Sequence, residues 1–524
     1  MHGAGIWDGG EPRRLASRGP VSEGTKVVTD EARSEWRARL RSLPPIFWVI
    51  VAVGIGLRIY AFDAYSAHHP DEIIQYLEQA HRRVFGYGIV PWEFRYVMRS
   101  WLIPLAVTGP MQLGEWLQPG GTLYLILPRA LVAALNFSPV IAAWFIGART
   151  SRQHAIVAMA VTALWVESVM FSVHTLSESM AVASFMPAAA LLRPEARLRS
   201  IVAAGFLMAL AGLLRFQYAP AIAVYAMFAA GRDARLWKGL VIGGLPVLAG
   251  GAAIDLAMGL VPYQWVWTNF RLNVTEARML EHGGLSAWTY VNKAWAHMKF
   301  AAPLILILSL FAGRAYRPLL IAAAFNIGFH QLIGHREYRY LWLSLQILLV
   351  LAAIGSVNVA GKSIAGRHLA RPGSTAVTAA LLLLWGSASL ALTATKMYRG
   401  KWRENGDPAR LGAMAGRDPT VCGLAVPMRQ FTEFGYVLVH RPIPIYLLDA
   451  RLAPTLARPG EAAAAFNAMI VPANVTPPPG YGARIGCGGR PSKQVCLYRR
   501  PGGCAPNAAS AGREYQRVLL SLDR

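Results

Sequence analysis

The chain has 524 residues, of which 54% are hydrophobic and 15% are charged, and its formal net charge is +24. Soluble domains carry about 25% charged residues, so this composition excludes an ordinary soluble protein. A nucleic-acid-binding protein gathers such a charge in polar domains or stripes, whereas Arg and Lys here punctuate long apolar runs. The chain is therefore predicted to be an α-helical, multi-pass integral membrane protein that binds no nucleic acid.

The N-terminal region, residues 1–43, is polar and mixed in charge. It lacks the order of basic segment, apolar core and small-residue cleavage site that defines a signal peptide. The first apolar run, residues 44–62, is therefore expected to be a retained span that also serves as the targeting signal, with residues 1–43 as a cytoplasmic tail.

Apolar segments that approach the roughly 20 residues needed to cross a bilayer recur as far as residue 395. We expect about 11 transmembrane helices, with an error of one or two, in a domain of residues 44–395. They fall at 44–62, 122–147, 154–173, 175–192, 200–214, 217–230, 239–258, 301–313, 317–333, 340–358 and 375–395.

The basic residues of the short loops set the predicted orientation. Thirteen basic residues and two acidic ones lie in the loops that follow even-numbered spans. The basic residues are Arg149, Arg152, Arg193, Arg197, Arg199, Arg232, Arg235, Lys238, Arg314, Arg317, Lys362, Arg367 and Arg371. Because cytoplasmic loops carry the excess of Lys and Arg, the outer side is expected to hold residues 63–121, 259–300 and 396–524.

The tail, residues 396–524, is predicted to be a small α/β domain on the outer side. Its apolar runs at 435–440, 443–450 and 468–473 read as strands, and residues 499–513 are expected to be loop-like or disordered. All four cysteines of the chain, Cys422, Cys487, Cys496 and Cys504, lie in this tail. Disulfides persist outside the cytoplasm, but three pairings are possible and unpaired buried thiols are an alternative.

The stretch "HPDEIIQYLEQA", residues 69–80, places Asp71 and Glu72 beside the first span. An acidic first turn is ordinary helix-start chemistry and needs no function. However, carboxylates at a membrane face are costly to bury and favour a functional site. Helical spacing also places Asp71, Gln75 and either Glu78 or Gln79 along one side.

Basic residues also occur on the predicted outer side, against the general trend of the loops. They are Arg99, Arg215 and the group His335, Arg336 and Arg339 in "GHREYRYLWL". Arginine can grip phosphate oxygens in a bidentate manner, so these residues favour a phosphate-bearing ligand. The alternative is that each side chain reaches towards lipid headgroups.

Several catalytic signatures are absent from the sequence. It contains no D-x-D pair, no phosphate-binding G-x-x-x-x-G-K-[ST] loop, no H-E-x-x-H and no G-x-S-x-G. These absences argue against nucleotide-sugar chemistry on a D-x-D-bound metal and against ATP-driven transport.

Residues 69–100 resemble the first outer loop of family 22 glycosyltransferases. These are the dolichyl-phosphate-mannose-dependent α-mannosyltransferases of GPI-anchor and N-glycan assembly and their bacterial relatives. The matching positions are His69–Glu72, Gly86–Gly88, Pro91–Glu93 (with Pro91 for the family's Thr) and Arg99–Pro104. Three later segments also resemble family motifs: 174–181, 268–274 and 334–342. In the first of them, His174 stands for the family's Arg and Glu178 for its Asn. The resemblance keeps this order over roughly residues 44–345.

The resemblance implies a GT-C fold and an inverting transfer of a sugar, usually mannose, at the outer membrane face. The donor would be a polyprenyl-phosphate sugar, and the acceptor a lipid-linked molecule or a glycan. Asp71 would be the general base, and Glu72 would orient the acceptor or tune Asp71. No redox or nucleotide cofactor is implied, and a divalent cation stays open without a ligand set.

The resemblance also implies two sets of binding residues. Arg215, His335, Arg336 and Arg339, with Arg99 in addition, are expected to stabilise the donor phosphate. His69, Gln75, Trp92, Glu93 and Asn269 are expected to bind substrate.

Two other functions remain open from the sequence. One is another GT-C enzyme that moves a different lipid-linked sugar. The other is a transporter or flippase for a polyprenyl-linked glycan, which should show intramembrane charges and inverted repeats, and no internal repeat is visible. The high Ala, Arg and Gly content indicates a bacterial inner membrane with a periplasmic site, or the ER membrane if the source is eukaryotic.

Overall fold

The computed structural model describes residues 42–272, 286, 288–333, 336–365, 375–399, 406–427, 434–448, 460–489 and 494–521. The expected tail up to residue 41 and the predicted phosphate ligand His335 lie outside these residues. The chain forms two compact units, 1–49 and 50–524, and the second contains the candidate active site.

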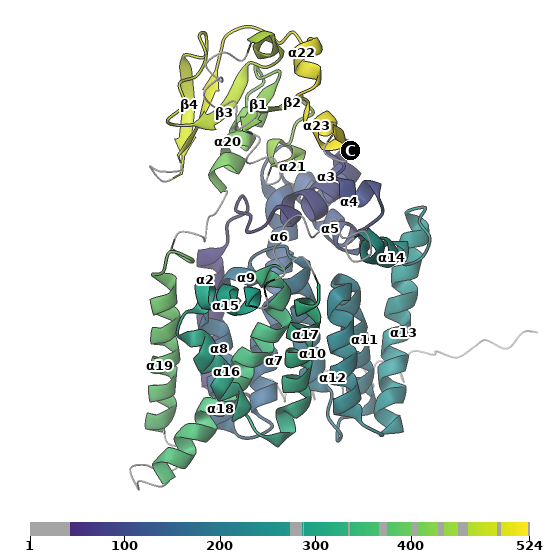
Figure 1. Cartoon of the computed structure of the whole chain (residues 1–524), viewed down its shortest axis with the longest axis vertical. Coiled ribbons are helices and arrows are strands. Elements are labelled where there is room, and N and C mark those ends of the chain that lie inside the picture. The colour runs from purple at the N-terminus through teal and green to yellow at the C-terminus, as the bar shows by residue number, and fades with distance from the viewer. Residues whose placement is uncertain are drawn as a thin grey trace, which may run out of the picture. The chain divides into compact units, whose positions relative to one another are not determined.

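Helices fill the region predicted to span the membrane, and neighbouring helices pack side by side (Figure 1). They are α2 (Pro45–Ala61), α6 (Leu123–Leu135), α7 (Ser138–Gly147), α8 (Arg152–Leu164), α9 (Val166–Ser172), α10 (Ser177–Leu191), α11 (Leu198–Leu214), α12 (Ala219–Ala230), α13 (Ala234–Ala257), α16 (Ala301–Leu310), α17 (Arg317–Gln331), α18 (Trp342–Ala365) and α19 (Thr375–Thr393). Each predicted span therefore coincides with one helix or with two consecutive helices.

Several of these helices are shorter than a bilayer crossing requires. Among the described residues, four helical segments are long and apolar enough to cross a membrane, or up to six if two bent pairs each count as one span. One bent pair is α8 with α9, at 61°, and the other is α15 (Thr289–Met298) with α16, at 106°. The protein is an integral membrane protein whose helices are frequently broken.

Side chains satisfy the backbone groups that the α8–α9 break exposes. The hydroxyl of Ser389 accepts from Val166 N at 2.9 Å and donates to Leu164 O at 2.9 Å. The guanidinium of Arg58 donates to Ala163 O at 2.9 Å. Non-helical backbone at membrane depth is tolerated where such partners replace the lost hydrogen bonds, so the bend at Trp165 needs no water.

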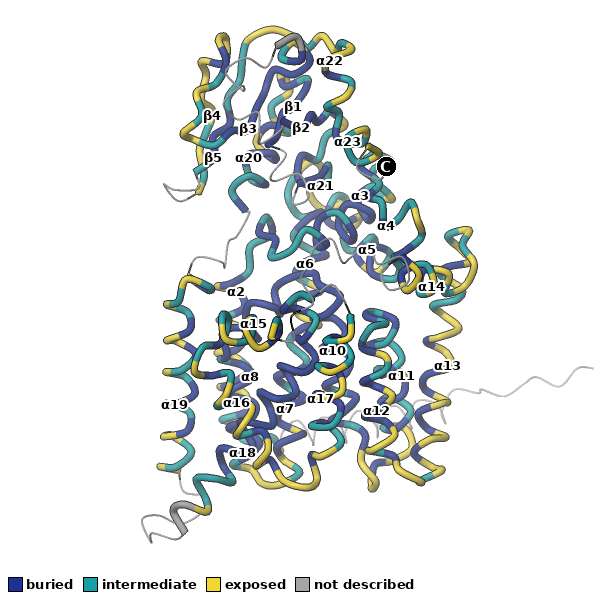
Figure 2. Tube along the Cα trace, in the orientation of Figure 1, coloured by how far each residue is buried: buried dark blue, intermediate teal, exposed yellow. Residues whose placement is uncertain are grey.

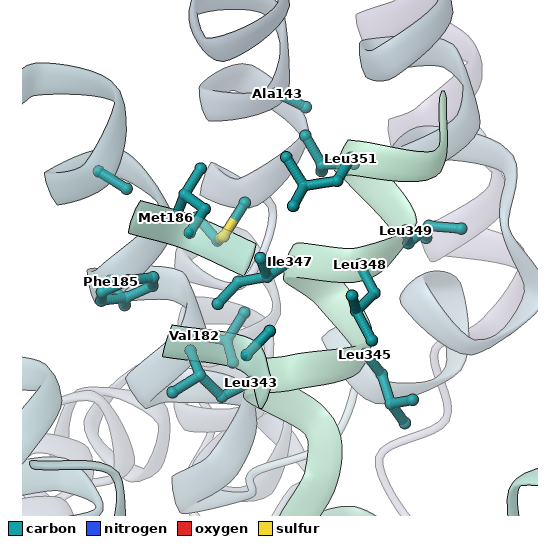
Figure 3. Close-up of a cluster of buried hydrophobic side chains, with 14 of the residues drawn as sticks. Ala143, Val182, Phe185, Met186, Leu343, Leu345, Ile347, Leu348, Leu349 and Leu351 are labelled. Atoms are coloured by element: carbon teal, nitrogen blue, oxygen red, sulfur yellow. The ribbon is translucent and has the colours of Figure 1, made fainter. Parts of the chain in front are cut away.

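Helix α18 lies at the centre of the helical core. Of its apolar window, 83% is buried, against 22% for α13 and for α19, which lie at the periphery (Figure 2). Its residues Leu343, Ile347 and Leu351 recur every four positions and lie beside Val182 and Met186 of α10 (Figure 3). This period of one helical turn is what buries one face of a helix against a neighbour.

The predicted outer loop 63–121 is largely helical. It contains η1 (Glu72–Leu77), a π-helical segment, followed by α3 (Glu78–Phe85), α4 (Trp92–Arg95) and α5 (Leu102–Leu117). Asp71 is the N-cap residue of η1. Single π-helical turns occur frequently at functional sites, and here one begins at Glu72, the second residue of the acidic pair.

The tail forms the small α/β domain that was expected. Its five-stranded sheet has the order β2-β1-β3-β5-β4, in which β1 is parallel to β2 and β3, and β5 is antiparallel to β3 and β4. The elements are α20 (Gly406–Arg417), β1 (Leu424–Pro427), α21 (Tyr436–Val439), β2 (Ile445–Leu448), β3 (Ala468–Pro472), β4 (Ala483–Gly488), β5 (Val495–Arg499), α22 (Ala508–Ala511) and α23 (Tyr515–Ser521).

Two of the three predicted strands are confirmed, as β2 and β3, and the third is wrong. Residues 435–440 contain the helical turn α21, because the amide of Val437 points into the outer loop and donates to Oε2 of Glu78 at 2.8 Å. Burial raises the pKa of the Glu78 carboxyl to about 7. The hydroxyl of Tyr124 donates to Val437 O at 2.6 Å, so the tail domain supports the helix that follows Asp71.

Two disulfides settle the pairing that the sequence left open. They join Cys422 to Cys504 and Cys487 to Cys496. The first fastens the stretch 499–513 to the sheet domain, and this stretch also contains helix α22. Of the two expected alternatives, residues 500–507 are loop-like, and the capping box of Asn507 starts the helical turn that follows.

The exposed disulfide cysteine allows a test of orientation. Cys487 is exposed and Cys496 is buried. If the tail lies outside the cytoplasm, a membrane-impermeant maleimide should label intact cells after mild reduction, and the signal should fall in Cys487→Ser. Labelling only after permeabilisation would reverse the predicted orientation.

Candidate active site

Asp71 lies at the centre of a buried polar cluster. Its Oδ2 is 2.8 Å from NH1 of Arg339, and its Oδ1 is 3.2 Å from Nδ1 of His69 and accepts from Nε2 of Gln75 at 2.9 Å. Burial opposes ionisation of Asp71, but the charges of Arg339 and His69 outweigh it and hold the pKa of this carboxyl well below its ordinary value. Asp71 is therefore an ionised carboxylate in the absence of ligand.

His69 completes this side of the cluster. Its Nε2 lies 3.3 Å from Oε2 of Glu337, which also pairs with Nε of Arg339. Burial opposes protonation of His69, but the Asp71 carboxylate outweighs it and raises the pKa of the imidazole to about 9. His69 thus lies between two carboxylates, and its side chain remains 26% exposed, so a ligand can reach it.

A second carboxylate, Glu178 of α10, connects Arg339 to Arg215. Its Oε1 lies 3.1 Å from NH1 of Arg339 and 3.2 Å from NH2 of Arg215. The ring of Tyr340 lies under both guanidinium groups, 4.7 Å from that of Arg215 and 5.2 Å from that of Arg339. The segment 63–121, predicted to be an outer loop, therefore meets α10, the end of α11 and the segment before α18 in one ion-pair chain.

Arg215 also lines a small cavity together with Arg99. Other walls come from Tyr76, Ser100 and Ser177. Within the described part of the chain, the Nε atoms of both arginines are buried without a hydrogen-bond partner. A buried charged group without a full set of partners is costly, so two cations that face one cavity favour an anionic ligand there.

A large apolar groove adjoins this cavity. It has a volume of about 820 Å³ and runs along α11, α12 and α13. Leu213, Phe216 and Trp265 line both the groove and the cavity. The site can therefore accept a molecule with an anionic head and a long apolar tail.

The structure argues against the expected acceptor-orienting role of Glu72. This side chain is fully buried. Its oxygens accept from the backbone amides of His68, at 2.7 Å, and Thr175, at 2.8 Å, and lie 3.1 Å from His174 and 3.3 Å from Arg129. Glu72 thus joins the start of η1 to α6 and to the segment before α10, and its contact with the Asp71 cluster is the backbone amide of His69, at 3.3 Å.

Besides His69, two more of the expected substrate-binding residues join the Asp71 cluster. Gln75 bridges Asp71 and Glu93, donating to Oε1 of Glu93 at 2.8 Å. Burial raises the pKa of the Glu93 carboxyl, Arg99 opposes the shift and Asp71 adds to it. Glu93 is the N-terminal acidic residue of α4 and is buried.

Three other predicted site residues have their described contacts outside this cluster: Trp92, Asn269 and Arg336. Trp92 is half-buried and packs against Tyr96. Asn269, on α14 (Gln264–Phe270), donates to Met98 O at 3.4 Å and so contacts the residue before Arg99. Arg336 donates to the backbone carbonyls of Ile333, Ser286 and Gln331, and none of these described contacts reaches the ion-pair chain.

The sequence analysis assigned no role to three buried polar residues that contact the acidic pair or its arginines: Arg129, and the motif positions His174 and Glu178. Arg129 and Glu178 lie inside apolar runs, where an ionisable residue marks a site or a buried partner. That signal was present in the sequence. Among the described residues, no three His, Cys, Asp or Glu side chains gather as a metal site would require.

Comparison with known proteins places this site in a family. Residues 46–401 match the Alg9-like mannosyltransferase family, and the chain belongs to it. GPI mannosyltransferase 3 of Drosophila melanogaster is 35% identical over 92 residues, and mannosyltransferase APTG1 of Arabidopsis thaliana is 32% identical over 84 residues. These stretches cover 17% and 16% of this chain but only 16% and 15% of the two relatives.

Two solved structures share the GT-C fold. ArnT from Cupriavidus metallidurans, bound to undecaprenyl phosphate, matches with a TM-score of 0.50 and 13% identity, over 88% of this chain and 100% of ArnT. AglB from Archaeoglobus fulgidus, in complex with an inhibitory peptide and a dolichol-phosphate, matches with a TM-score of 0.50 and 12% identity, over 82% of this chain and 69% of AglB. At these identities the likeness shows the fold alone.

Proposed function

We propose that this enzyme transfers mannose, or a related sugar, from a polyprenyl-phosphate donor to a lipid-linked or glycan acceptor at the outer membrane face. The observation that carries the proposal is the shared wall between the Arg99–Arg215 cavity and the apolar groove of α11–α13. A polyprenyl phosphate has the two matching parts, an anionic head and a long hydrocarbon tail. The ligands of ArnT and AglB, which share the fold, support the same donor class.

In the proposed reaction, the acceptor hydroxyl oxygen attacks the anomeric carbon and forms the new glycosidic bond. The bond between that carbon and the phosphate oxygen breaks, and the lipid phosphate leaves with the electron pair. Asp71 takes the acceptor proton as general base. Attack opposite to the leaving group inverts the anomeric centre.

Charge develops on the leaving phosphate, and fixed cations at that point lower the barrier. Arg99 and Arg215 supply these cations in the cavity, with Arg339 behind them in the ion-pair chain. The guanidinium groups of Arg99 and Arg215 can each donate two hydrogen bonds to phosphate oxygens. The cavity has a volume of about 30 Å³, so binding of a phosphate requires its walls to move apart.

The donor site can be tested with Arg215→Ala and Arg215→Lys. Charge-assisted hydrogen bonds contribute roughly 1.5–3 kcal/mol, so Arg215→Ala should weaken use of undecaprenyl-phosphate mannose about ten- to a hundredfold. Lys should rescue partly, because it keeps the charge but loses the planar fork. The measurement is donor titration in membranes at a fixed concentration of lipid-extract acceptor.

Arg336→Ala is the matched control, because this arginine lies on the same side but holds backbone carbonyls. A second arm fills the groove with Ala223→Trp, which should weaken a long-chain donor and spare a ten-carbon polyprenyl-phosphate mannose. Unchanged donor titration in both Arg215→Ala and Ala223→Trp would reject this donor site.

A further inference from the structure

Arg339 has more anionic partners than one guanidinium needs. Its NH1 lies 2.8 Å from Asp71 and 3.1 Å from Glu178, while its Nε pairs with Glu337. The proposed base is therefore engaged in an ion pair in this structure. A carboxylate held in this way is a poor proton acceptor until the cation leaves it.

Glu178 is the group that links this ion pair to the phosphate cavity. One oxygen, Oε1, contacts Arg339 at 3.1 Å and Arg215 at 3.2 Å, and the side chain is fully buried. Arg215 also lines the cavity, and its Nε atom is buried without a partner among the described residues. An anion in the cavity must compete with Glu178 for the guanidinium of Arg215.

A buried charge without a partner is costly. When the guanidinium of Arg215 leaves Glu178 to bind a phosphate, Glu178 therefore needs another cation. The remaining cation in contact with Glu178 is Arg339. Asp71, by contrast, keeps His69 at 3.2 Å and Gln75 at 2.9 Å when Arg339 shifts towards Glu178. The exchange therefore leaves no buried charge unpaired.

We propose that Glu178 is a positioning residue that couples phosphate binding at Arg215 to the release of Asp71 from Arg339. The inference rests on the proposed donor site. Its consequence is an ordered reaction, in which the base becomes available only after the donor phosphate has bound. Because such coupling is reciprocal, removing the Glu178 charge must change the affinity for the lipid phosphate.

The test measures binding of undecaprenyl phosphate to the purified full chain in nanodiscs, which needs no turnover. Glu178→Gln removes the competitor for Arg215, so the affinity should rise about tenfold, within the 5- to 150-fold range of typical couplings. Glu337→Gln is the control: it removes an equal charge that contacts Arg339, and its effect should stay below about threefold. In transfer assays, Glu178→Gln should lower the donor KM and lower kcat as well.

Each outcome decides a different point. Equal tightening in both variants would mean a simple charge effect and would overturn the coupling, as would unchanged or weaker binding in Glu178→Gln. If Glu178→Gln does not fold, Glu178→Asp keeps the charge but is too short to span both arginines, and it should show the same tightening. If Arg215→Ala leaves undecaprenyl-phosphate binding unchanged, the proposed donor site itself fails; if it weakens binding while Glu178 variants do nothing, only the coupling fails.

Discussion

Asp71→Asn should abolish sugar transfer while leaving membrane insertion intact. Arg339 keeps Glu178 and Glu337 as anionic partners, so the loss of thermal stability should be smaller than that expected for Glu72→Gln. A positioned general base contributes on the order of 10²–10⁴-fold, so kcat should fall at least that far. The amide keeps the size of the carboxylate and can still contact Gln75, but it cannot take the acceptor proton. The measurement is single-turnover transfer from undecaprenyl-phosphate mannose by purified enzyme of verified fold.

Asp63→Asn provides the matched control for this variant. Asp63 is another buried, arginine-paired carboxylate of the same loop region, held by Arg410 of the tail domain. It contacts none of the described partners of Asp71, so its loss should leave kcat near normal. Turnover by Asp71→Asn at the level of Asp63→Asn would return Asp71 to the role of a helix-start residue.

The sequence located the acidic and basic parts of this site but not their pairing. Asp71, Arg99, Arg215 and Arg339 stood out because charges are rare in apolar surroundings. Their contacts join residues far apart in the chain: 268 positions separate Asp71 from Arg339. No local periodicity reports such a distance, so the bridging role of Glu178 became visible only in the fold.

The contacts of the two adjacent residues Asp71 and Glu72 could not be predicted from the sequence either. Asp71 and Glu72 are adjacent, and adjacency predicts mutual tuning of two catalytic carboxylates. In the structure the two side chains diverge at the start of η1, one towards Arg339 and the other towards Arg129 and His174. Successive helical residues point about 100° apart, so neighbours in sequence serve different clusters.

Secondary structure was predictable where the pattern was long and failed where it was short. The apolar runs of the membrane domain all became helices, and two of the tail strands are present. The four-residue turn α21 cannot be told from a strand by periodicity. Its helical form depends on the buried Glu78 of a distant helix, which accepts the Val437 amide.

Glu72→Gln should destabilise the protein strongly and leave the kinetics of correctly folded enzyme almost unchanged. The substitution removes the anion paired with Arg129, which is fully buried in α6. Breaking a buried ion pair from one side costs roughly 3–5 kcal/mol, because the remaining charge has no compensation. The yield of folded enzyme and the melting temperature in nanodiscs should therefore fall sharply.

The stability difference between the wild type and Glu72→Gln should depend on pH. Burial opposes ionisation of Glu72, but His174 and Arg129 outweigh it and lower the pKa of the folded-state carboxyl to about 2. A lowered pKa stabilises the fold above the unfolded pKa, and that contribution is lost as the pH falls towards 2. The gap in melting temperature between wild type and Glu72→Gln should be complete at neutral pH and narrow below about pH 4.3, the unperturbed value for Glu.

The double variant Glu72→Gln/Arg129→Met separates pairing from catalysis. Replacing both partners of a buried ion pair by groups of similar volume is often nearly neutral, so the double variant should recover much of the stability that Glu72→Gln loses. If Glu72→Gln instead melts like the wild type and loses transfer activity, then Glu72 acts on the acceptor, as the sequence resemblance implied. In that case the contacts of Glu72 with Arg129 and His174 would have to open during the catalytic cycle.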